Sequence, residues 1–524
     1  MNSRALFLPA LALSASVGCS SAEVDETDDP LTSVTARSRT LMFDGFVFVS
    51  PSASDSEVLA AVRKQTQTAF GALRTSNVGV NSRELRDVDV KTFRKKSVKV
   101  VDTASPSLPA AMMTRVDYRF TDNAVVPVEM AKRSSLSLAV LRPNYAAETD
   151  RILKECTAND SHAQDFRDSL WYAFDPANSP NCKSAMSAEA AKIEASRKGL
   201  NAFGGEISKV EANRLYIPIT VSLGADKTNQ QTSYPEYDRL FSGGVEKGVV
   251  TVGLVNGFVG HDTPEDSTDT GFPLWLDELR AAFSTQDFLF KSSEKPIGWL
   301  TLGGKTLTLD PREAVHWLVV GDAAMPSAVR ALSPLDAASA RTKLSDQLVK
   351  NWLTFEANIQ VKIGSNAPTN SKIRVNSYFG SSDDPTPHKR AIKTSDIFLY
   401  NGHSYIGYGP LDPKNFRASD FPSSYQILFI NGCVSYNYYE KDYIPLKSGG
   451  TKNLDLVTNG LETPVWGSGK STGAFIGGLL SGKQPSWIDL LKSAAMTDEL
   501  RVVDGELDNT YSPKVTPITV VSMK

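Results

Sequence analysis

Two apolar runs in the C-terminal third of the chain lead directly into residues that can do nucleophilic chemistry. The run DIFLYNGH ends in His403, and the later run QILFINGC ends in Cys433. The whole chain has only five histidines and four cysteines. An imidazole beside a thiol takes up its proton and lowers the pKa of the cysteine, which makes the sulfur a nucleophile near neutral pH. The two run ends therefore predict a His–Cys dyad, provided that the fold brings them together.

The elements that must bring them together are two strands of one parallel sheet. Uninterrupted apolar runs of this kind indicate strands that are covered on both faces. In a parallel sheet, catalytic groups collect beyond the carboxyl ends of the strands, so neighbouring strands would place both residues on one rim. We expect Gly402 and Gly432 to let the chain turn sharply off each strand. The alternative is that His403 and Cys433 are buried at strand ends with packing roles only.

The cysteine count bears on the same choice. Cys156 and Cys182 lie close together in the sequence and flank a polar, proline-containing loop, which makes them the natural disulfide pair. If Cys19 carries a lipid, Cys433 is the cysteine left over. A leftover cysteine in an exported protein indicates a reactive thiol, although a small buried hydrophobe fits the count equally well.

A strand ending in His followed by a strand ending in Cys resembles the caspase–gingipain–legumain clan of cysteine peptidases. The resemblance covers about residues 340–490 and implies an α/β sandwich in which the dyad needs no third acid. It implies that His403 is the general acid/base and Cys433 the nucleophile, with the backbone N–H of Cys433 and one near Ser404 as the oxyanion donors. In the clan, loops after the cysteine strand shape the substrate cleft, which implies that Trp466 and Ser468 line it.

The N-terminus has the pattern of a secretory signal peptide. A single basic residue, Arg4, precedes an apolar stretch and then small residues. The end of this stretch, SVGC, resembles a bacterial lipobox, so we expect a signal peptide over 1–19 and lipidation of Cys19. Ordinary cleavage after Ala22 is the alternative. The acidic segment that follows predicts a flexible tether over 20–38, and the protein is expected in the cell envelope, anchored to the outer membrane, or otherwise periplasmic or secreted.

The composition is that of a globular protein and gives no indication that the protein binds nucleic acid. The chain has 524 residues, of which 41% are hydrophobic and 22% charged, with a net charge of −3. This balance shows no electrostatic footprint for nucleic acid. No apolar run approaches the ~20 residues of a membrane-spanning helix. The length predicts two to three domains.

Hydrophobic periodicity divides the chain into three folded regions of an α/β protein. Residues 39–145 read as a βαββ-like α+β unit, and 146–335 as a second mixed region that contains the disulfide loop. Within the second region, WLTLGGKTLTL predicts a hairpin, with Gly303 and Gly304 in its turn. Residues 336–524 contain short apolar runs between connections, which predicts a caspase-like domain with a largely parallel sheet and helices around it.

Two further motifs resemble ligand-binding loops, one for phosphate and one for calcium. In each, a departure from the motif favours an ordinary loop without a ligand. WGSGKSTG, residues 466–473, has Pro464 where a phosphate-binding loop needs Gly, so it predicts a strand-to-helix loop. HDTPEDSTDTG, residues 261–271, gathers carboxylates that could bind calcium but lacks the spacing of a calcium loop, so it predicts a solvated acidic loop. No histidine pair has metal-ligand spacing. We therefore expect no metal and no cofactor.

Taken together, these patterns predict an exported cysteine endopeptidase that acts on protein or peptide substrates. The alternative is a catalytically inactive caspase-like surface lipoprotein with a binding or scaffold role. The regions before residue 336 either present substrate or inhibit the peptidase, and the sequence leaves both roles open.

Overall fold

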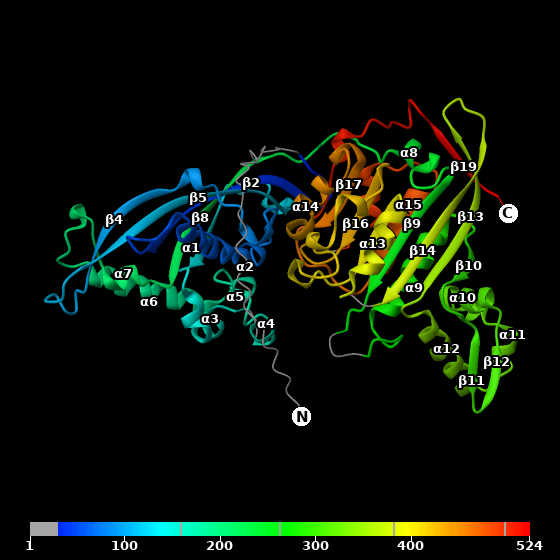
Figure 1. Cartoon of the computed structure of the whole chain (residues 1–524), viewed down its shortest axis with the longest axis horizontal. Coiled ribbons are helices and arrows are strands. Elements are labelled where there is room, and N and C mark those ends of the chain that lie inside the picture. Colours follow the sequence, from blue (N-terminus) through cyan, green and yellow to red (C-terminus); the bar gives the residue numbers. More distant parts are fainter. Residues whose placement is uncertain (1–29, 158–159, 261–263, 381–382, 497–498, 524) are drawn as a thin grey trace.

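The computed structural model describes residues 30–523, except 158–159, 261–263, 381–382 and 497–498, and it forms two lobes (Figure 1). The expected signal peptide, Cys19 and the first part of the tether lie outside the described residues. The last part of that tether is folded, contrary to expectation. Thr32–Ser33 (β1) pairs with a strand near the C-terminus, and a long strand begins at Ala36.

The N-terminal lobe is built on a seven-stranded sheet with the order β6-β8-β2-β5-β4-β7, and β3 pairs with β5. Its strands are β2 (Ala36–Val49), β3 (Gly79–Val80), β4 (Arg94–Val101), β5 (Ala111–Pro127), β6 (Ser135–Leu141), β7 (Glu206–Ser208) and β8 (Tyr216–Asp226). Its helices are α1 (Asp55–Gln67), α2 (Ala69–Arg74), α3 (Thr149–Cys156), α4 (Asp160–Asp165), α5 (Leu170–Ala173), α6 (Pro180–Ser196) and α7 (Lys209–Ala212). Helix α1 begins with a capping box between Ser54 and Glu57 and buries Val58 and Val62.

The C-terminal lobe is built on a ten-stranded sheet with the order β1-β18-β17-β16-β15-β9-β14-β13-β10, and β19 pairs with β13. Its strands besides β1 are β9 (Val249–Gly257), β10 (Leu289–Ser293), β13 (Trp352–Ile363), β14 (Thr369–Gly380), β15 (Ile397–Asn401), β16 (Gln426–Asn431), β17 (Leu454–Asn459), β18 (Arg501–Asp504) and β19 (Ile518–Ser522). The five central strands, from β14 to β17, are parallel, and the outer strands pair antiparallel. The α/β class is confirmed, but the sheet is mixed rather than largely parallel.

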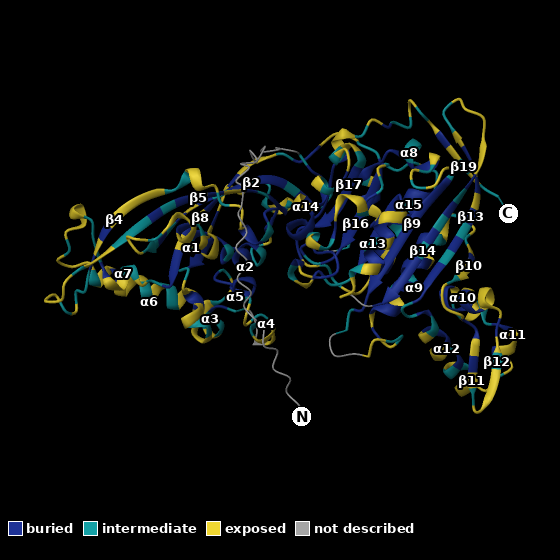
Figure 2. Ribbon diagram, in the orientation of Figure 1, coloured by how far each residue is buried: buried dark blue, intermediate teal, exposed yellow. Residues whose placement is uncertain are grey.

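The helices of this lobe cover the sheet or lie at its edge. They are α8 (Tyr237–Ser242), α9 (Gly271–Ala282), α10 (Pro311–Val320), α11 (Ser327–Arg330), α12 (Pro334–Leu348), α13 (Pro385–Thr394), α14 (Lys441–Tyr443), α15 (Ser468–Leu480) and α16 (Trp487–Ser493). The strands β11 (Trp299–Leu302) and β12 (Lys305–Thr308) form the predicted hairpin, and both turn glycines have positive φ angles. Figure 2 shows this hairpin largely exposed, in contrast to the buried central strands.

The domain boundaries expected at residues 145 and 336 do not separate folded units. Strand β8, from the second predicted region, lies between β6 and β2 of the first. Strand β9, from the same region, lies at the centre of the C-terminal sheet between β14 and β15. The folded units are set by pairing between strands that lie far apart in the sequence. Local periodicity does not reveal which strands pair.

The central strands are apolar throughout because both faces of the sheet are covered. In β15, Ile397 and Leu399 face a core formed with α9, α15 and α16, whereas Phe398 and Tyr400 face the opposite core. That second core continues into the N-terminal lobe, where Phe70 lies 6.3 Å from Tyr438, measured between ring centroids. The two lobes therefore share one hydrophobic cluster.

Polar contacts also join the N-terminal lobe to the segment that follows the Cys433 strand. The Asn437 amide donates to the carbonyls of Val80 and Ser82, over 3.1 and 2.6 Å, and its oxygen accepts from the Glu84 N–H. Asn437 belongs to a π-helical turn, Tyr436–Glu440. The expected disulfide is confirmed, because Cys156 and Cys182 are bonded and link α3 to α6.

Candidate active site

The fold brings His403 and Cys433 to the same cavity. Strands β15 and β16 are adjacent and parallel, and their last residues, Asn401 and Asn431, are register partners. His403 and Cys433 each follow two residues after these partners, so they occupy equivalent positions at the carboxyl ends. Both line one small cavity of about 80 Å³. This is the arrangement that the sequence predicts for the dyad.

A main-chain carbonyl orients the imidazole of His403. The ring Nε2 lies 2.9 Å from the carbonyl oxygen of Val259. A carbonyl can only accept a hydrogen bond, so this contact requires the proton on Nε2 and leaves the lone pair of the neutral ring on Nδ1. The nitrogen with basic character is therefore Nδ1.

The segment that carries Val259 is held by a buried carboxylate. Asp269 accepts hydrogen bonds from the N–H groups of Val259, Gly260 and Gly271, over 3.0, 2.8 and 2.7 Å. Asp269 belongs to the acidic segment 261–271, whose first three residues lie outside the described residues. The segment is thus not wholly solvated, since one of its carboxylates organises the backbone around the candidate site. Among the described residues, no group of three or more acidic, His or Cys side chains is placed to hold a metal.

The thiol of Cys433 is half-buried and protonated at neutral pH. Its Sγ lies 4.0 Å from the carbonyl oxygen of Thr463, in the loop after β17. Burial raises the pKa of the Cys433 thiol, and the nearby Glu462 carboxylate raises it further. The surroundings of the sulfur thus favour the neutral thiol over the thiolate that the sequence suggests.

Strained backbone follows both candidate residues. Tyr405 and Ile406, just after His403 and Ser404, have φ angles of 48° and 54°, and Val434, just after Cys433, has a φ angle of 53°. Side chains other than glycine rarely adopt this region, and each such residue costs about 1–3 kcal/mol. Strain of this kind clusters at functional sites, where the surrounding structure maintains it.

The two glycines before the dyad do not make the turns that the sequence suggests. Neither Gly402 nor Gly432 has a positive φ angle, and the chain reverses at the strained residues instead. Gly402 is required for another reason: a Cβ there would lie 2.4 Å from the hydroxyl of Tyr400, which donates to the His403 carbonyl over 2.8 Å. A Cβ at Gly432 would make only ordinary contacts, the nearest being 3.4 Å to the Gly402 carbonyl oxygen.

A row of asparagines that the sequence analysis missed runs beneath the dyad. Four parallel strands, β9, β15, β16 and β17, each end in Asn-Gly, and the four residues are Asn256, Asn401, Asn431 and Asn459. The Asn431 amide donates to the Asn401 oxygen over 2.5 Å, and the Asn459 amide donates to the Asn431 oxygen over 3.0 Å. The repeated Asn-Gly after four apolar runs is the signal in the sequence that predicts this row.

Buried charged groups lie at both ends of the asparagine row. At one end, Glu278 of α9 accepts from the amides of Asn256 and Asn401. At the other end, Arg501 donates to the oxygens of Asn431 and Asn459, over 2.9 and 3.0 Å. Arg501 also forms a buried ion pair with Glu499 at 3.2 Å. The row therefore fixes the carboxyl ends of four strands relative to one another.

The loop after β17 supplies part of the cavity wall. Ser468, the first residue of α15, lines the cavity, whereas Trp466 is 79% exposed and does not line it. The predicted strand-to-helix loop over 466–473 is wrong for most of its length, because only Trp466 and Gly467 precede the helix and residues 468–473 form the first turns of α15. Of the two residues proposed for the cleft from the resemblance, only Ser468 lies at the cavity.

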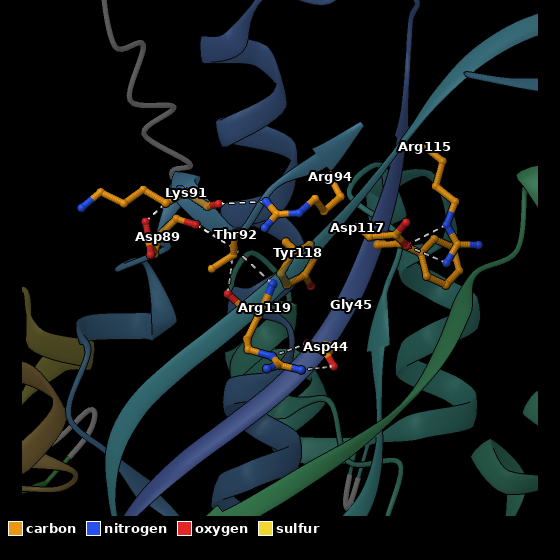
Figure 3. A pocket seen from close by; sticks show the side chains of 11 residues that line it. Asp44, Gly45, Asp89, Lys91, Thr92, Arg94, Arg115, Asp117, Tyr118 and Arg119 are labelled. Atoms are coloured by element: carbon orange, nitrogen blue, oxygen red, sulfur yellow. Dashed lines mark hydrogen bonds and ion pairs between the residues drawn. The ribbon is translucent and has the colours of Figure 1, made fainter. Parts of the chain in front are cut away.

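A larger hollow of about 700 Å³ lies on the exposed face of the N-terminal sheet (Figure 3). Two of its arginines turn toward carboxylates: Arg119 donates to Asp44 through two nitrogens, and Arg115 donates to Asp117. The third, Arg94, donates to the main-chain carbonyls of Lys91 and Phe93. Two ion pairs thus engage four of the seven charged side chains that line the hollow. Its lining contains no cysteine, serine or histidine, so it offers no counterpart of the His403 and Cys433 arrangement.

No family model, curated protein or solved structure matches the chain. Within the described residues, no helix combines the length and the apolar content needed to cross a membrane.

Proposed function

We propose that the chain is a cysteine endopeptidase of the caspase–gingipain–legumain type, with His403 and Cys433 as its dyad. The observation that carries this proposal is their shared position. Both residues line one cavity at equivalent places on adjacent parallel strands. The strained residues that follow each of them support the same assignment.

The proposed reaction transfers an acyl group to sulfur and then to water. The Cys433 thiol gives its proton to Nδ1 of His403 as the sulfur attacks the substrate carbonyl carbon. The carbon–nitrogen bond breaks, and His403 gives the proton to the leaving amine. A water molecule, deprotonated by His403, then attacks the thioester, releases the carboxylic acid and restores the thiol. The backbone N–H of Cys433 and one near Ser404 are the proposed donors to the oxyanion.

The carbonyl of Val259 has a defined part in this reaction. It holds the Nε2 proton throughout, so the imidazole rotates little between accepting and donating a proton at Nδ1. When the ring becomes positively charged, the same carbonyl stabilises it. No acidic side chain is needed in this role, in keeping with the resemblance to a clan whose dyad needs no third acid.

Export of the protein is part of the proposal. The disulfide between Cys156 and Cys182 supports an oxidising compartment, where such bonds persist. We propose attachment to the cell envelope through a lipid on Cys19, with protein or peptide as the substrate. Neither a cofactor nor nucleic acid has a role in the proposed reaction.

One observation favours the alternative of an inactive binding or scaffold protein. Burial raises the pKa of Cys433, and an inert buried cysteine behaves in the same way. The two proposals differ in whether His403 affects the chemistry of the sulfur. In the inactive protein, replacement of His403 leaves the reactivity of Cys433 unchanged.

The test is hydrolysis of a peptide library by the protein beginning at Ser20, compared with three variants. We expect Cys433→Ala and His403→Ala to lower cleavage by at least about a thousandfold, because the dyad residues act as a unit. His316→Ala, at an exposed position of α10, is the matched control and retains full activity. Cleavage that survives in Cys433→Ala with the same specificity would reject the proposal.

A further inference from the structure

Among the residues that the structure describes, no Asp, Glu, Lys or Arg side chain lines the cavity beside Cys433. Apart from His403 and Cys433, its described side chains are neutral: the polar ones are Asn256, Asn401, Asn431, Thr463 and Ser468, and the apolar ones are Val259, Leu274, Pro464 and Val465. Placing a charged group in such a site without a partner costs several kcal/mol. The cavity therefore excludes charged side chains.

The asparagine amides of the wall are already engaged by the protein. The amide nitrogen of Asn256 donates to Glu278 over 2.9 Å, and that of Asn401 donates to Glu278 and to the Thr472 hydroxyl. The amide of Asn431 donates to Asn401. A ligand group that needs several strong donors, such as a carboxylate, would have to break this network.

The size of the cavity limits its occupant further. At about 80 Å³ it has room for only a few water-sized groups. A cavity of about 150 Å³ engineered in another protein accepts a benzene ring. A methyl or hydroxymethyl group fits the smaller volume, whereas a long or aromatic side chain does not.

We propose that this cavity is the subsite for the side chain next to the scissile carbonyl, and that it selects small uncharged residues: glycine, alanine and serine. The inference rests on the proposed peptidase function. A carbonyl carbon within reach of the sulfur of Cys433 places the adjacent side chain against the wall that Cys433 and His403 share. The neutral lining then determines which side chain can enter.

Irreversible peptidyl acyloxymethyl ketones test the inference on the intact protein. In these probes the cysteine sulfur displaces the carboxylate leaving group and forms a thioether, which adds a known mass to the peptide that contains Cys433. We compare probes that differ only in the residue next to the ketone: alanine, serine, valine, aspartate and arginine. Alanine and serine probes are expected to label Cys433 at least about a hundredfold faster than the aspartate and arginine probes.

Iodoacetamide separates failure of this inference from failure of the proposed function, because it has no side chain to place in the cavity. If iodoacetamide labelling depends on His403 but arginine or aspartate is preferred, or all probes react equally, the subsite assignment is overturned and the dyad stands. If His403→Ala changes labelling by neither reagent type, the peptidase proposal is overturned and this inference falls with it.

A change in the cavity wall provides a second measurement. Leu274→Ala enlarges the cavity without altering the dyad or the asparagine row. We expect the labelling rate of the valine probe relative to the alanine probe to rise by about tenfold or more. Leu302→Ala, in the distant hairpin, is the matched control and leaves the ratio unchanged. An unchanged ratio in Leu274→Ala, with the thermal midpoint retained, would place the substrate side chain elsewhere.

Discussion

The hydroxyl of Ser404 donates a hydrogen bond to the main-chain carbonyl of Cys433 over 2.5 Å. This contact joins the two turns that carry the candidate dyad. The Ser404 carbonyl in turn accepts from the hydroxyl of Tyr439, over 3.1 Å. The position of the Cys433 sulfur relative to the His403 imidazole therefore depends on Ser404. The Ser404 side chain takes no part in the proposed reaction itself.

We predict that Ser404→Ala lowers peptidase activity far more than it lowers stability. Loss of one buried hydrogen bond costs about 1 kcal/mol in the free energy of unfolding, whereas misplacement of the sulfur is expected to lower kcat/KM by tenfold or more, about 1.4 kcal/mol in the barrier. Ser404→Thr keeps the hydroxyl and should restore most of the activity. Ser284→Ala, which removes an exposed hydroxyl-to-carbonyl bond in the turn after α9, serves as a control remote from the dyad. If Ser404→Ala and Ser284→Ala lower kcat/KM equally, Ser404 does not position the dyad.

We predict that alkylation of Cys433 in the folded protein is slow at neutral pH and accelerates in the alkaline range. Burial raises the thiol pKa, so the thiolate fraction becomes large only above the range in which an ordinary cysteine titrates. The measurement is the iodoacetamide labelling rate from about pH 6 to about pH 10, with the unfolded chain as reference. A folded protein that labels fully at the acidic end of this range would instead have a resting ion pair.

We predict that Glu278→Gln removes a pH-dependent loss of stability that the wild-type protein shows as the pH rises toward neutrality. Burial raises the pKa of Glu278 from 4.5 to about 7, so between these values the folded chain keeps a proton that the unfolded chain has lost. Stability therefore falls as the pH rises through this window, by roughly 3 kcal/mol in total. The Gln variant lacks this pH-dependent loss because its amide stays neutral, but its single oxygen can accept from only one of the two asparagine amides, so a constant penalty for the other applies at both pH values. Denaturant unfolding at about pH 5 and about pH 8 measures the effect.

The matched variant for that experiment is Glu278→Ala. It removes the acceptor for the amides of Asn256 and Asn401 and is expected to destabilise the protein at both pH values, by about 1–3 kcal/mol for each amide left without a partner. Parallel pH profiles for the wild type and Glu278→Gln would show that this carboxylate does not titrate in the window.

We predict that the disulfide stabilises the N-terminal lobe alone. The bond closes a sequence separation of 26 residues, for which loop-closure entropy gives about 3.5 kcal/mol. The double variant Cys156→Ala/Cys182→Ala should unfold this lobe at lower denaturant concentration, and a reductant should reproduce the shift in the wild type. Iodoacetamide labelling of Cys433 under native conditions should be unchanged. Faster labelling would show that unfolding of this lobe opens the candidate site.

Those parts of the fold that depend on local pattern were predictable from the sequence. The hairpin around Gly303 follows from its turn residues, and the strands before His403 and Cys433 follow from uninterrupted apolar runs with both faces buried. The disulfide pair follows from cysteine spacing. Each of these features is decided by residues within about 30 positions of one another, a distance over which periodicity and turn chemistry are informative.

The parts of the fold and the candidate site that the sequence did not predict depend on contacts between residues far apart in the chain. The carbonyl that orients His403 belongs to Val259, 144 residues away. The partner of the Asn401 amide, Glu278, is 123 residues away. Strand β9 shares the Asn-Gly ending but carries no histidine or cysteine, yet its central place in the sheet supplies both Asn256 and the segment with Val259. No local periodicity predicts which strands become neighbours.

The Asn-Gly ends of the four central strands also determine how this protein ages. In an Asn-Gly pair, the glycine nitrogen can attack the side-chain amide, expel ammonia and form a succinimide that opens to aspartate or isoaspartate. Extended strands and engaged amides hold these groups apart while the sheet is intact. Partial unfolding during storage or heating releases them, and deamidation of Asn431 would set a carboxylate against the side-chain oxygen of Asn401. Such damage would therefore strike the residues that fix the strand ends beneath the dyad.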